Sequence, residues 1–475
     1  MTRITTIHRT WRWGRLRDQL RRAIAAAGRA ADYCEIRLEE RTFTSLRFQG
    51  SVLESIAQGT NSGGMVRALK DGGWGMVTFN RPGDFGEMID LAIRQAALVG
   101  RAKKEPVLLA PVEPIEDVVA LEIVRDPRSI PLAEKTHLLE EYNRQILSFG
   151  PPIASSIVSY ADAYTKKIFA NSEGTYIEQE RIDVAGSLTA IATKGRDTQL
   201  QHFGFGSTLD ADVVLGHEDR VAELCRDAAA LLEAPPVQGG EYTVILDPIL
   251  AGVFIHEAFG HLSEADNVYE NEELQELMRL GKKVGAEILS VYDTGLEPGA
   301  RGYLRYDDEG VPVQKTYLIK NGILAGRLHS RETAGKMGEP PTGNARAVNY
   351  AFAPIPRMRT TCIEEGTSSF AEMLSGVSLG IYAQEAYGGQ TDGEQFTFTA
   401  GRARMIREGR LAEFVRDVTL TGNVFTTLKN IDRIGNDLAR PEGPGGCGKA
   451  GQYPLPVSMW SPHIRIQRVV IGGKR

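Results

Sequence analysis

Hydrophobic and polar residues alternate with two different periodicities along the first half of the chain. Four segments repeat apolar residues at helical spacing and are predicted to be helices: 15–31, 85–100, 131–149 and 213–234. Period-two alternation predicts a strand pair over 34–50, a strand over 75–80, and strands across 153–205 with a turn at 171–174. The proline-containing stretch 107–121 is expected to be an extended connector.

One segment suits neither a helix nor a strand and divides the chain. Residues 234–240 read APPVQGG, and proline and glycine interrupt both kinds of element. Beyond it we expect one helix and then mainly strands and turns, including a two-residue hairpin at Asn321-Gly322. The pattern predicts an α+β protein, with an N-terminal α/β domain over residues 1–234 and a β-rich C-terminal domain over residues 241–475.

Length and charge narrow the class of protein. A chain of 475 residues is long for one hydrophobic core, which favours two domains. The formal net charge of −6 gives no support for direct nucleic-acid binding, which usually needs a basic surface. Basic residues cluster only over 9–23, where they continue into an amphipathic pattern and are interpreted as the solvated face of a helix rather than a binding arm.

The sequence also predicts a cytoplasmic protein without a membrane span. No run approaches the roughly 18 apolar residues that cross a bilayer. The apolar segment of a signal peptide is not recognisable at the N-terminus. Four cysteines, Cys34, Cys225, Cys362 and Cys447, show no repeating spacing, which is typical of reduced thiols in a cytoplasm.

The stretch 255–261, IHEAFGH, concentrates chemistry in one predicted helix. Asp247-Pro248 is a favourable helix start, because Asp caps free backbone N–H groups and Pro suits the first helical position. The surrounding residues are apolar, so this helix is expected to be buried. Three ionisable residues, His256, Glu257 and His261, therefore need hydrogen-bond partners or a metal ion.

The spacing of the two histidines decides what a metal site would require. Residues five apart are offset by roughly 140° on a regular α-helix, so the two rings would diverge. A single π-bulge would return them to one face, and such bulges concentrate at functional sites. Gly260 lowers the steric cost of that distortion. We therefore expect either a kinked helix around a metal or two core histidines satisfied by hydrogen bonds.

A third ligand would distinguish these alternatives, and the sequence offers two sources. Five glutamates follow the motif, Glu264, Glu270, Glu272, Glu273 and Glu276, although such acids usually form a solvated helix face. The competitor is Cys447 in GPGGCGKA, beside Lys449, which would favour a thiolate. This string is not a phosphate-binding loop, because Ala450 replaces the required hydroxyl residue and no strand–loop–helix context surrounds it.

Several motifs together resemble the TldD/PmbA family of modulators of DNA gyrase, which are regarded as metallopeptidases. The motifs are HEAFGH at 256–261, YDDEGVPVQKTYLIKNGILAGRL at 306–328, TGNARA at 342–347 and GPGGCGKAGQ at 443–452. The resemblance spans most of the chain and is strongest from Tyr242 onward. Because H-E-x-x-x-H is intact, the chain resembles the catalytic TldD type rather than the partner type that lacks those residues.

The resemblance implies a zinc site and a function. His256, His261 and Cys447 would bind one zinc ion, with Glu257 as the catalytic acid/base, in a peptidase acting on unfolded proteins or short peptides. The resemblance also implies dimers, either homodimers or heterodimers with a PmbA/TldE-type paralogue. A non-catalytic regulatory subunit of such a complex is the alternative. The sequence further offers Tyr303, His329 and Tyr382 as oxyanion donors, unless they are ordinary structural residues.

Overall fold

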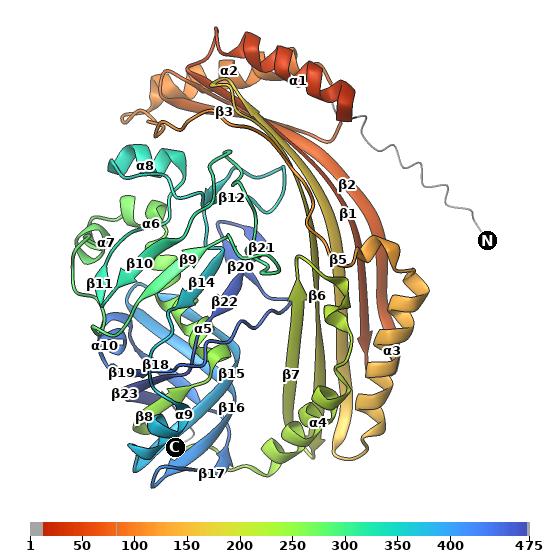
Figure 1. The fold of residues 1–475 in the computed structure, drawn as a ribbon, viewed down its shortest axis with the longest axis vertical. Helices are drawn as coiled ribbons and strands as arrows, with labels where there is room; N and C mark the ends of the chain where they lie inside the picture. Colours follow the sequence, from red (N-terminus) through yellow and green to blue (C-terminus); the bar gives the residue numbers. More distant parts are fainter. Residues whose placement is uncertain (1–12, 82, 473–475) are drawn as a thin grey trace.

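The computed structural model describes residues 13–81 and 83–472, and its first half is built on one long, curved sheet. Figure 1 shows these strands curving along one side of the second half. The strands are β1 Tyr33–Gln49, β2 Val52–Lys70, β3 Gly73–Phe79, β4 Glu116–Val119, β5 Ile153–Asn171, β6 Tyr176–Lys194 and β7 Asp197–Ser207. Their order is β3-β2-β1-β5-β6-β4, with β7 also paired to β6, and only the β4–β6 pairing is parallel.

The predicted strand pair over 34–50 is wrong. These residues form the single strand β1, whose hairpin partner is β2. Period-two alternation is the same in one long strand and in a hairpin, and the chain turns only at Gly50, where φ is +55°. The turn after β5 is confirmed, because Asn171 Oδ1 accepts the N–H groups of Glu173 and Thr175.

The four predicted helices are confirmed, with shifted ends. They are α1 Trp13–Ala27, α2 Phe85–Ala102, α3 Leu132–Ser148 and α4 Glu218–Glu233. The last begins later than expected, because a 3₁₀ turn at Ala211–Val214 and Gly216 at φ +76° precede it. Of the basic cluster, residues 9–12 lie outside the described residues, and the rest belongs to α1, which buries Leu16 and Leu20.

The second half is β-rich and contains a closed ring of five strands. Its larger sheet has the order β15-β8-β23-β18-β16-β17, with β19 on β23, and an additional β15–β16 pairing closes the ring. The strands are β8 Gly240–Leu246, β15 Leu379–Asp392, β16 Gln395–Arg407, β17 Arg410–Val415, β18 Thr419–Asn423, β19 Ile431–Ile434 and β23 Ile464–Gly472. Helix α5, Pro248–Ile255, packs against this ring, where Phe254 meets Phe396 and Phe398 edge-on.

Smaller elements complete the second half. A five-stranded sheet has the order β11-β10-β9-β14-β22: β9 Val291–Thr294, β10 Thr316–Lys320, β11 Ile323–Leu324, β14 Thr360–Ile363 and β22 Ser458–Trp460. Two ribbons pair β12 Ala345–Arg346 with β13 Ile355–Pro356, and β20 Gly446–Lys449 with β21 Gln452–Pro456. Five short helices are α6 Ala265–Tyr269, α7 Glu272–Leu277, α8 Arg331–Met337, α9 Phe370–Ser375 and α10 Val424–Lys429. The fold is thus α+β with a β-rich second half, as predicted.

The hairpin predicted at Asn321-Gly322 is confirmed. It joins β10 to β11, with Lys320 opposite Ile323, and both turn residues have positive φ angles. A two-residue turn of this kind matches the twist of antiparallel strands. Among the described residues, no helix is long and apolar enough to cross a membrane.

Buried ion pairs join the sheet of the first half to a loop of the second. Arg301 donates from two nitrogens to the two carboxylate oxygens of Asp183, each at 2.9 Å. Lys167 lies 2.7 Å from Asp308, and the guanidinium of Arg67 is 2.9 Å from Glu309. Arg301, together with Asp308 and Glu309 of the motif at 306–328, therefore fixes the two halves against each other, which brings the second half to the concave face of the sheet.

Candidate metal centre

The helix that carries the two histidines changes its geometry at the first of them. Asp247 caps α5 by accepting the N–H of Leu250 at 2.8 Å. The α-helix ends at Ile255, and His256–Gly260 forms a π-helical turn in which the N–H of His261 donates to the carbonyl of His256. This is the distortion predicted from the five-residue spacing, and it turns both rings to one side.

Gly260 serves this turn for a different reason from the one expected. Its φ of −57° and ψ of −49° are ordinary helical values, so the backbone does not need the freedom of glycine. A Cβ atom at this position would lie 2.0 Å from Sδ of Met358, which is fully buried. Glycine is needed here because the helix passes very close to Met358.

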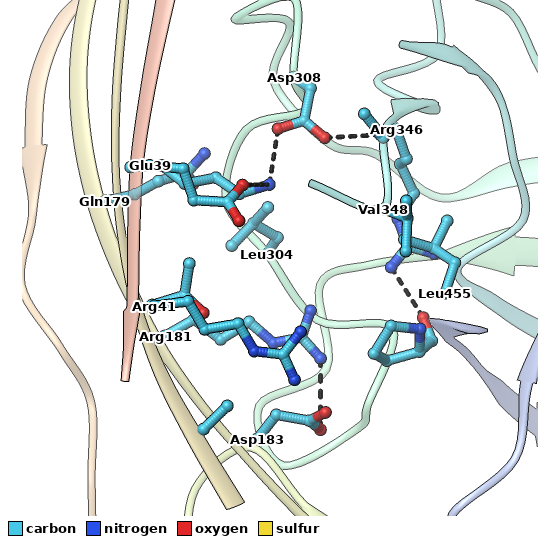
Figure 2. A pocket seen from close by; sticks show the side chains of 15 residues that line it. Glu39, Arg41, Gln179, Arg181, Asp183, Leu304, Asp308, Arg346, Val348 and Leu455 are labelled. Carbon is cyan, nitrogen blue, oxygen red and sulfur yellow. Dashed lines mark hydrogen bonds and ion pairs between the residues drawn. The ribbon is translucent and has the colours of Figure 1, made fainter. Parts of the chain in front are cut away.

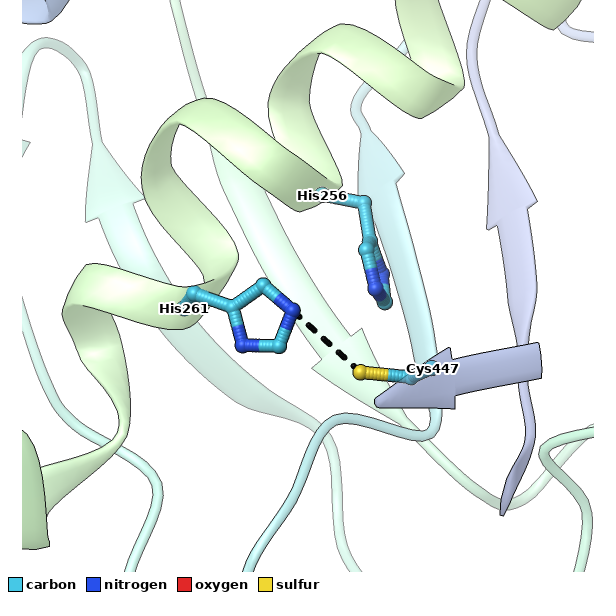
Figure 3. A group of neighbouring side chains, drawn as sticks. All are labelled: His256, His261 and Cys447. Atoms are coloured by element: carbon cyan, nitrogen blue, oxygen red, sulfur yellow. Dashed lines mark hydrogen bonds between the residues drawn. The ribbon is translucent and has the colours of Figure 1, made fainter. Parts of the chain in front are cut away.

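The structure brings His256, His261 and Cys447 together, and we call these three the His-His-Cys group. Their ligand atoms all lie within 4.8 Å of one another. Figure 3 shows both rings and the thiol of β20 directed toward a common point. The ring centroids are 5.3 Å apart at an angle of 80°, and Nε2 of His261 lies 3.3 Å from Sγ of Cys447.

His256 is fully buried and has an unsatisfied nitrogen. Its Nε2 has no hydrogen-bond partner among the described residues, and Nδ1 lies 3.4 Å from Oγ1 of Thr361. Burial, with the nearby charge of His261, lowers the pKa of His256 well below its usual value. The ring is therefore neutral at physiological pH, which is the form that binds metal ions.

A buried carboxylate orients His261. Oε2 of Glu264 lies 2.9 Å from Nδ1 of His261, so Nε2 is directed toward Cys447. Burial lowers the pKa of His261, but Glu264 and the thiol of Cys447 outweigh it and raise the pKa to about 11. Glu264 also lies 3.1 Å from the ammonium of Lys449, which contacts Asp266 at 2.5 Å. In metal sites, carboxylates in this position fix the ring and make it a better ligand.

Glu257 lies at the border of the His-His-Cys group. Its Oε2 is 3.8 Å from Nε2 of His261, and its side chain is 28% exposed. Burial raises the pKa of Glu257, and the charge of His261 partly opposes this. The carboxylate can therefore reach both solvent and the space beside the three ligand atoms.

The other acids offered by the sequence do not join the group as ligands. Glu264 contacts the far nitrogen of His261, so it supports a ligand instead. The remaining four are exposed to solvent, as the solvated-face interpretation predicted: Glu270, Glu272, Glu273 and Glu276. Of the two sources that the sequence offered, Cys447 is the one that lies with His256 and His261.

The three oxyanion candidates make their contacts elsewhere. His329 is buried between Thr333 and Glu339, at 3.1 Å and 3.0 Å from its two nitrogens. The hydroxyl of Tyr382 lies 2.9 Å from His463. Tyr303 packs on the cluster of Ala300, Cys362 and Trp460. None of these contacts involves the His-His-Cys group, which favours the structural interpretation of all three residues.

Sequence reasoning missed the residues that support the group from behind. Thr361 lies between His256 and Asp293, with its hydroxyl 3.4 Å from each. Asn344 donates to the other oxygen of Asp293 at 2.8 Å. The guanidinium of Arg357 donates to the carbonyl of Cys447 at 2.8 Å. The one sequence feature that could have pointed to these residues is the TGNARA motif, which contains Asn344. Its residue types alone do not indicate a metal site.

The donor set fits a metal ion. Two imidazole nitrogens and one thiol sulfur are ligands typical of zinc, and three protein ligands leave a fourth position open for water or substrate. The unsatisfied Nε2 of His256 is costly in a buried position unless something binds it.

Family models match nearly the whole chain. Three models of the PmbA/TldA metallopeptidases match in succession: domain 1 at residues 34–98, the central domain at 125–234 and the C-terminal domain at 239–473. The chain belongs to this family. The resemblance inferred from the motifs is thereby confirmed.

Relatives in this family carry names that refer to proteolysis. A metalloprotease of Synechocystis sp. is 44% identical over 444 residues, which cover 93% of this chain and 95% of that protein. A zinc metalloprotease TldD homolog of Saccharolobus solfataricus is 32% identical over 346 residues, covering 72% of this chain and 76% of the relative.

Solved structures share the fold. A Thermotoga maritima structure, whose name refers to modulation of a DNA gyrase, matches with a TM-score of 0.77 at 21% identity and covers 96% of this chain and 100% of its own. TldE from Thermococcus kodakarensis matches with a TM-score of 0.73 at 18% identity, covering 96% of this chain and 100% of its own. These identities are low, so the two structures bear on the fold alone.

Proposed function

We propose that this protein is a zinc-dependent peptidase that hydrolyses unfolded proteins or short peptides. One observation carries the proposal: three ligand atoms of the His-His-Cys group lie within 4.8 Å of one another, with Glu257 at their border. The names of the relatives in this family support the same reaction class.

In this proposal His256, His261 and Cys447 hold the zinc ion and Glu257 moves the proton. Zinc, when bound, supplies a Lewis acid that polarises a carbonyl group and acidifies water. Glu257 accepts a proton from the attacking water and returns it to the leaving amine of the cleaved peptide. Burial suits it to this task, because a raised pKa brings a carboxyl group closer to the working pH.

The surrounding residues keep the site ready for this reaction. Thr361 and Glu264 fix the orientation of the two rings through their far nitrogens, and Arg357 fixes the backbone of Cys447. Because these contacts are buried, the ligand atoms need little rearrangement when the metal binds. We further propose a cytoplasmic protein with domains at 1–234 and 241–475, which pairs with itself or with a PmbA/TldE-type paralogue.

The experiment compares the chain with Glu257→Gln. Elemental analysis of the purified chain is expected to give one zinc ion per chain, and hydrolysis of an unfolded peptide is expected. Glu257→Gln should keep the zinc and lose activity by about 100-fold or more, since general acid–base catalysis is worth 10²–10⁴. Glu276→Gln, an exposed acid beyond the motif, is the matched control and should behave like the unmodified chain.

Two results would contradict the proposal. A zinc-loaded chain whose hydrolysis is unaffected by Glu257→Gln would remove Glu257 from the reaction. A chain that is metal-free and inactive, alone and with zinc added, would favour the alternative of a non-catalytic subunit in a TldD/PmbA-type complex.

A further inference from the structure

A cavity lies where the two halves of the chain meet, one strand away from the strand that carries Cys447. The space in it that a water-sized group can occupy is about 80 Å³, and it opens to solvent. Its wall on one side is the concave face of the sheet in the first half. On the other side lie Arg346, Val348 and Leu455 (Figure 2). Leu455 pairs directly with Cys447 in the β20–β21 ribbon, so one wall of the cavity is continuous with the strand that carries the thiol ligand.

The cavity is lined by four cationic and three acidic side chains. The cations are Arg41, Lys167, Arg181 and Arg346, and the acids are Glu39, Asp183 and Asp308. Figure 2 shows Arg41 and Arg181 extending from the sheet and Arg346 on the opposite wall. The formal charge of the lining is thus positive, in a protein whose net charge is −6.

Each acid of the cavity is already engaged by a cation. Glu39 lies 3.8 Å from Lys167, which itself lines the cavity, and the other two acids are bound more closely. Both oxygens of Asp183 accept from Arg301 at 2.9 Å, which leaves Arg181 at 3.5 Å. Asp308 is bound by Lys167 at 2.7 Å and by a backbone N–H. These pairings take up most of the negative charge of the three acids, so little of it is left to neutralise the arginines that line the cavity.

Two of the three arginines of the cavity, Arg41 and Arg346, form no ion pair among the described residues, whereas Arg181 lies 3.5 Å from Asp183. Arg346 is only 4% exposed, and its guanidinium donates to the carbonyl oxygens of Met358 and Pro456, which carry no net charge. Burial, together with the neighbouring arginines, lowers the pKa of Arg346 well below its usual value. The side chain of Arg41 makes no hydrogen bond or ion pair with any part of the chain that the structure describes, and it is exposed to the cavity.

We propose that this cavity binds a carboxylate of the peptide, either its C-terminal carboxylate or an acidic side chain. Guanidinium groups offer paired N–H donors whose geometry matches a carboxylate, and charge-assisted bonds of this kind are roughly twice as strong as neutral ones. This inference rests on the proposed peptidase function for its substrate class. It adds a preference for peptides that carry a carboxylate at this position, which the His-His-Cys group alone does not supply.

The test measures binding in the zinc-loaded Glu257→Gln protein, so that turnover does not interfere. Three fluorescent peptides share one unfolded sequence: one with a free C-terminal carboxylate, one with a terminal amide, and one with a terminal amide and a single internal Asn→Asp change. The free carboxylate, the internal Asp, or both are expected to strengthen binding about tenfold over the plain amide. Which peptide binds tightly identifies the source of the carboxylate.

Variants assign the preference to the cavity. Arg41→Gln should abolish it and leave binding of the plain amide unchanged, because the side chain is exposed and supports no other residue. Arg47→Gln is the matched control on the same strand, since Arg47 pairs with Glu54 outside the cavity. Equal binding of all three peptides, or a preference that survives Arg41→Gln, would overturn the inference. A preference without hydrolysis by the unmodified chain would instead count against the peptidase function alone.

Discussion

The hydroxyl of Thr361 lies 3.4 Å from Nδ1 of His256, so strand β14 supports the first histidine of the His-His-Cys group. The same hydroxyl lies 3.4 Å from Oδ2 of Asp293 on the neighbouring strand β9. Asp293 is fully buried, and burial raises its pKa to about 6 despite the donors from Arg359 and Asn344. The orientation of His256 thus depends on two strands of the five-stranded sheet.

Thr361→Val should weaken zinc binding about tenfold, because removing an outer contact to a ligating histidine typically costs 10–100-fold in affinity. Valine has nearly the same shape, so the fold should be kept. The measurement is zinc affinity by competition with a chelator. Thr360→Val is a close control: Thr360 is equally buried, but its hydroxyl has no partner among the described residues. Equal affinities for the two variants would mean that Thr361 does not position His256.

Glu264→Gln should lower zinc affinity by about 10–100-fold, because His261 loses the carboxylate that holds its Nδ1. Lys449 keeps Asp266 as a partner, so it is not left without an acid. Zinc content and the free energy of unfolding are measured together, which separates a positioning effect from simple destabilisation. Glu272→Gln changes an exposed acid close by and should affect neither. Unchanged zinc affinity in Glu264→Gln would remove the positioning role.

Part of this candidate centre could be predicted from the sequence, because the two histidines lie close together in the chain and their spacing alone constrains the helix. The five-residue spacing of His256 and His261 demanded a distorted helix, and the structure has a π-helical turn there. Cys447 lies 186 residues beyond His261, so only the resemblance to a known family favoured it over the nearer glutamates.

The rest could not be predicted because it depends on tertiary contacts. Thr361 and Asp293 lie on short strands whose sequences carry no recognisable motif. They support His256 only because the pairing of these strands places them behind its ring. The sequence offered Glu264 as a possible ligand. Its contact with Nδ1 of His261, on the side of the ring away from Cys447, depends on the path of the chain after the π-helical turn. The length of β1 was also missed, because alternation marks a strand and says nothing about where it reverses.

Gly260→Ala should destabilise the protein by about 1–3 kcal/mol, the usual cost of overpacking a core. The added methyl group would collide with Sδ of Met358, which is fully buried and cannot move into solvent. The measurement is the free energy of unfolding in urea. Gly14→Ala is the matched helical control, because a Cβ at Gly14 meets nothing within 4 Å. That variant should be neutral or slightly stabilising.

A double variant distinguishes this collision from a backbone effect. Gly260→Ala combined with Met358→Ala should lose less stability than the sum of the two single changes, because the new methyl group enters the space that Met358 leaves. Strict additivity would show that the two side chains do not compete for the same volume.

Glu385 is expected to make the stability of the protein depend on pH. It lies on β15 and is only 5% exposed, with Asp247 and Arg402 nearby. Burial raises its pKa to about 7, and the charge of Arg402 opposes burial only in part. Between its ordinary value of 4.5 and about 7, the unfolded chain loses this proton while the folded chain keeps it. The stabilising effect of the protonated carboxyl is therefore full below pH 4.5 and is lost as the pH rises through 7.

Glu385→Gln removes this titration, so the stability of the variant relative to the unmodified protein should rise with pH. Between pH 4.5 and 7.5 the difference should shift in favour of the variant by up to roughly 3 kcal/mol, at about 1.4 kcal/mol for each pKa unit. Urea unfolding at the two pH values measures it. Glu413→Gln is the control: Glu413 is paired with Arg407 at the surface and its pKa is lowered, so it stays ionised over this range. A parallel pH dependence in Glu385→Gln and the unmodified protein would show that Glu385 is ionised in the folded state.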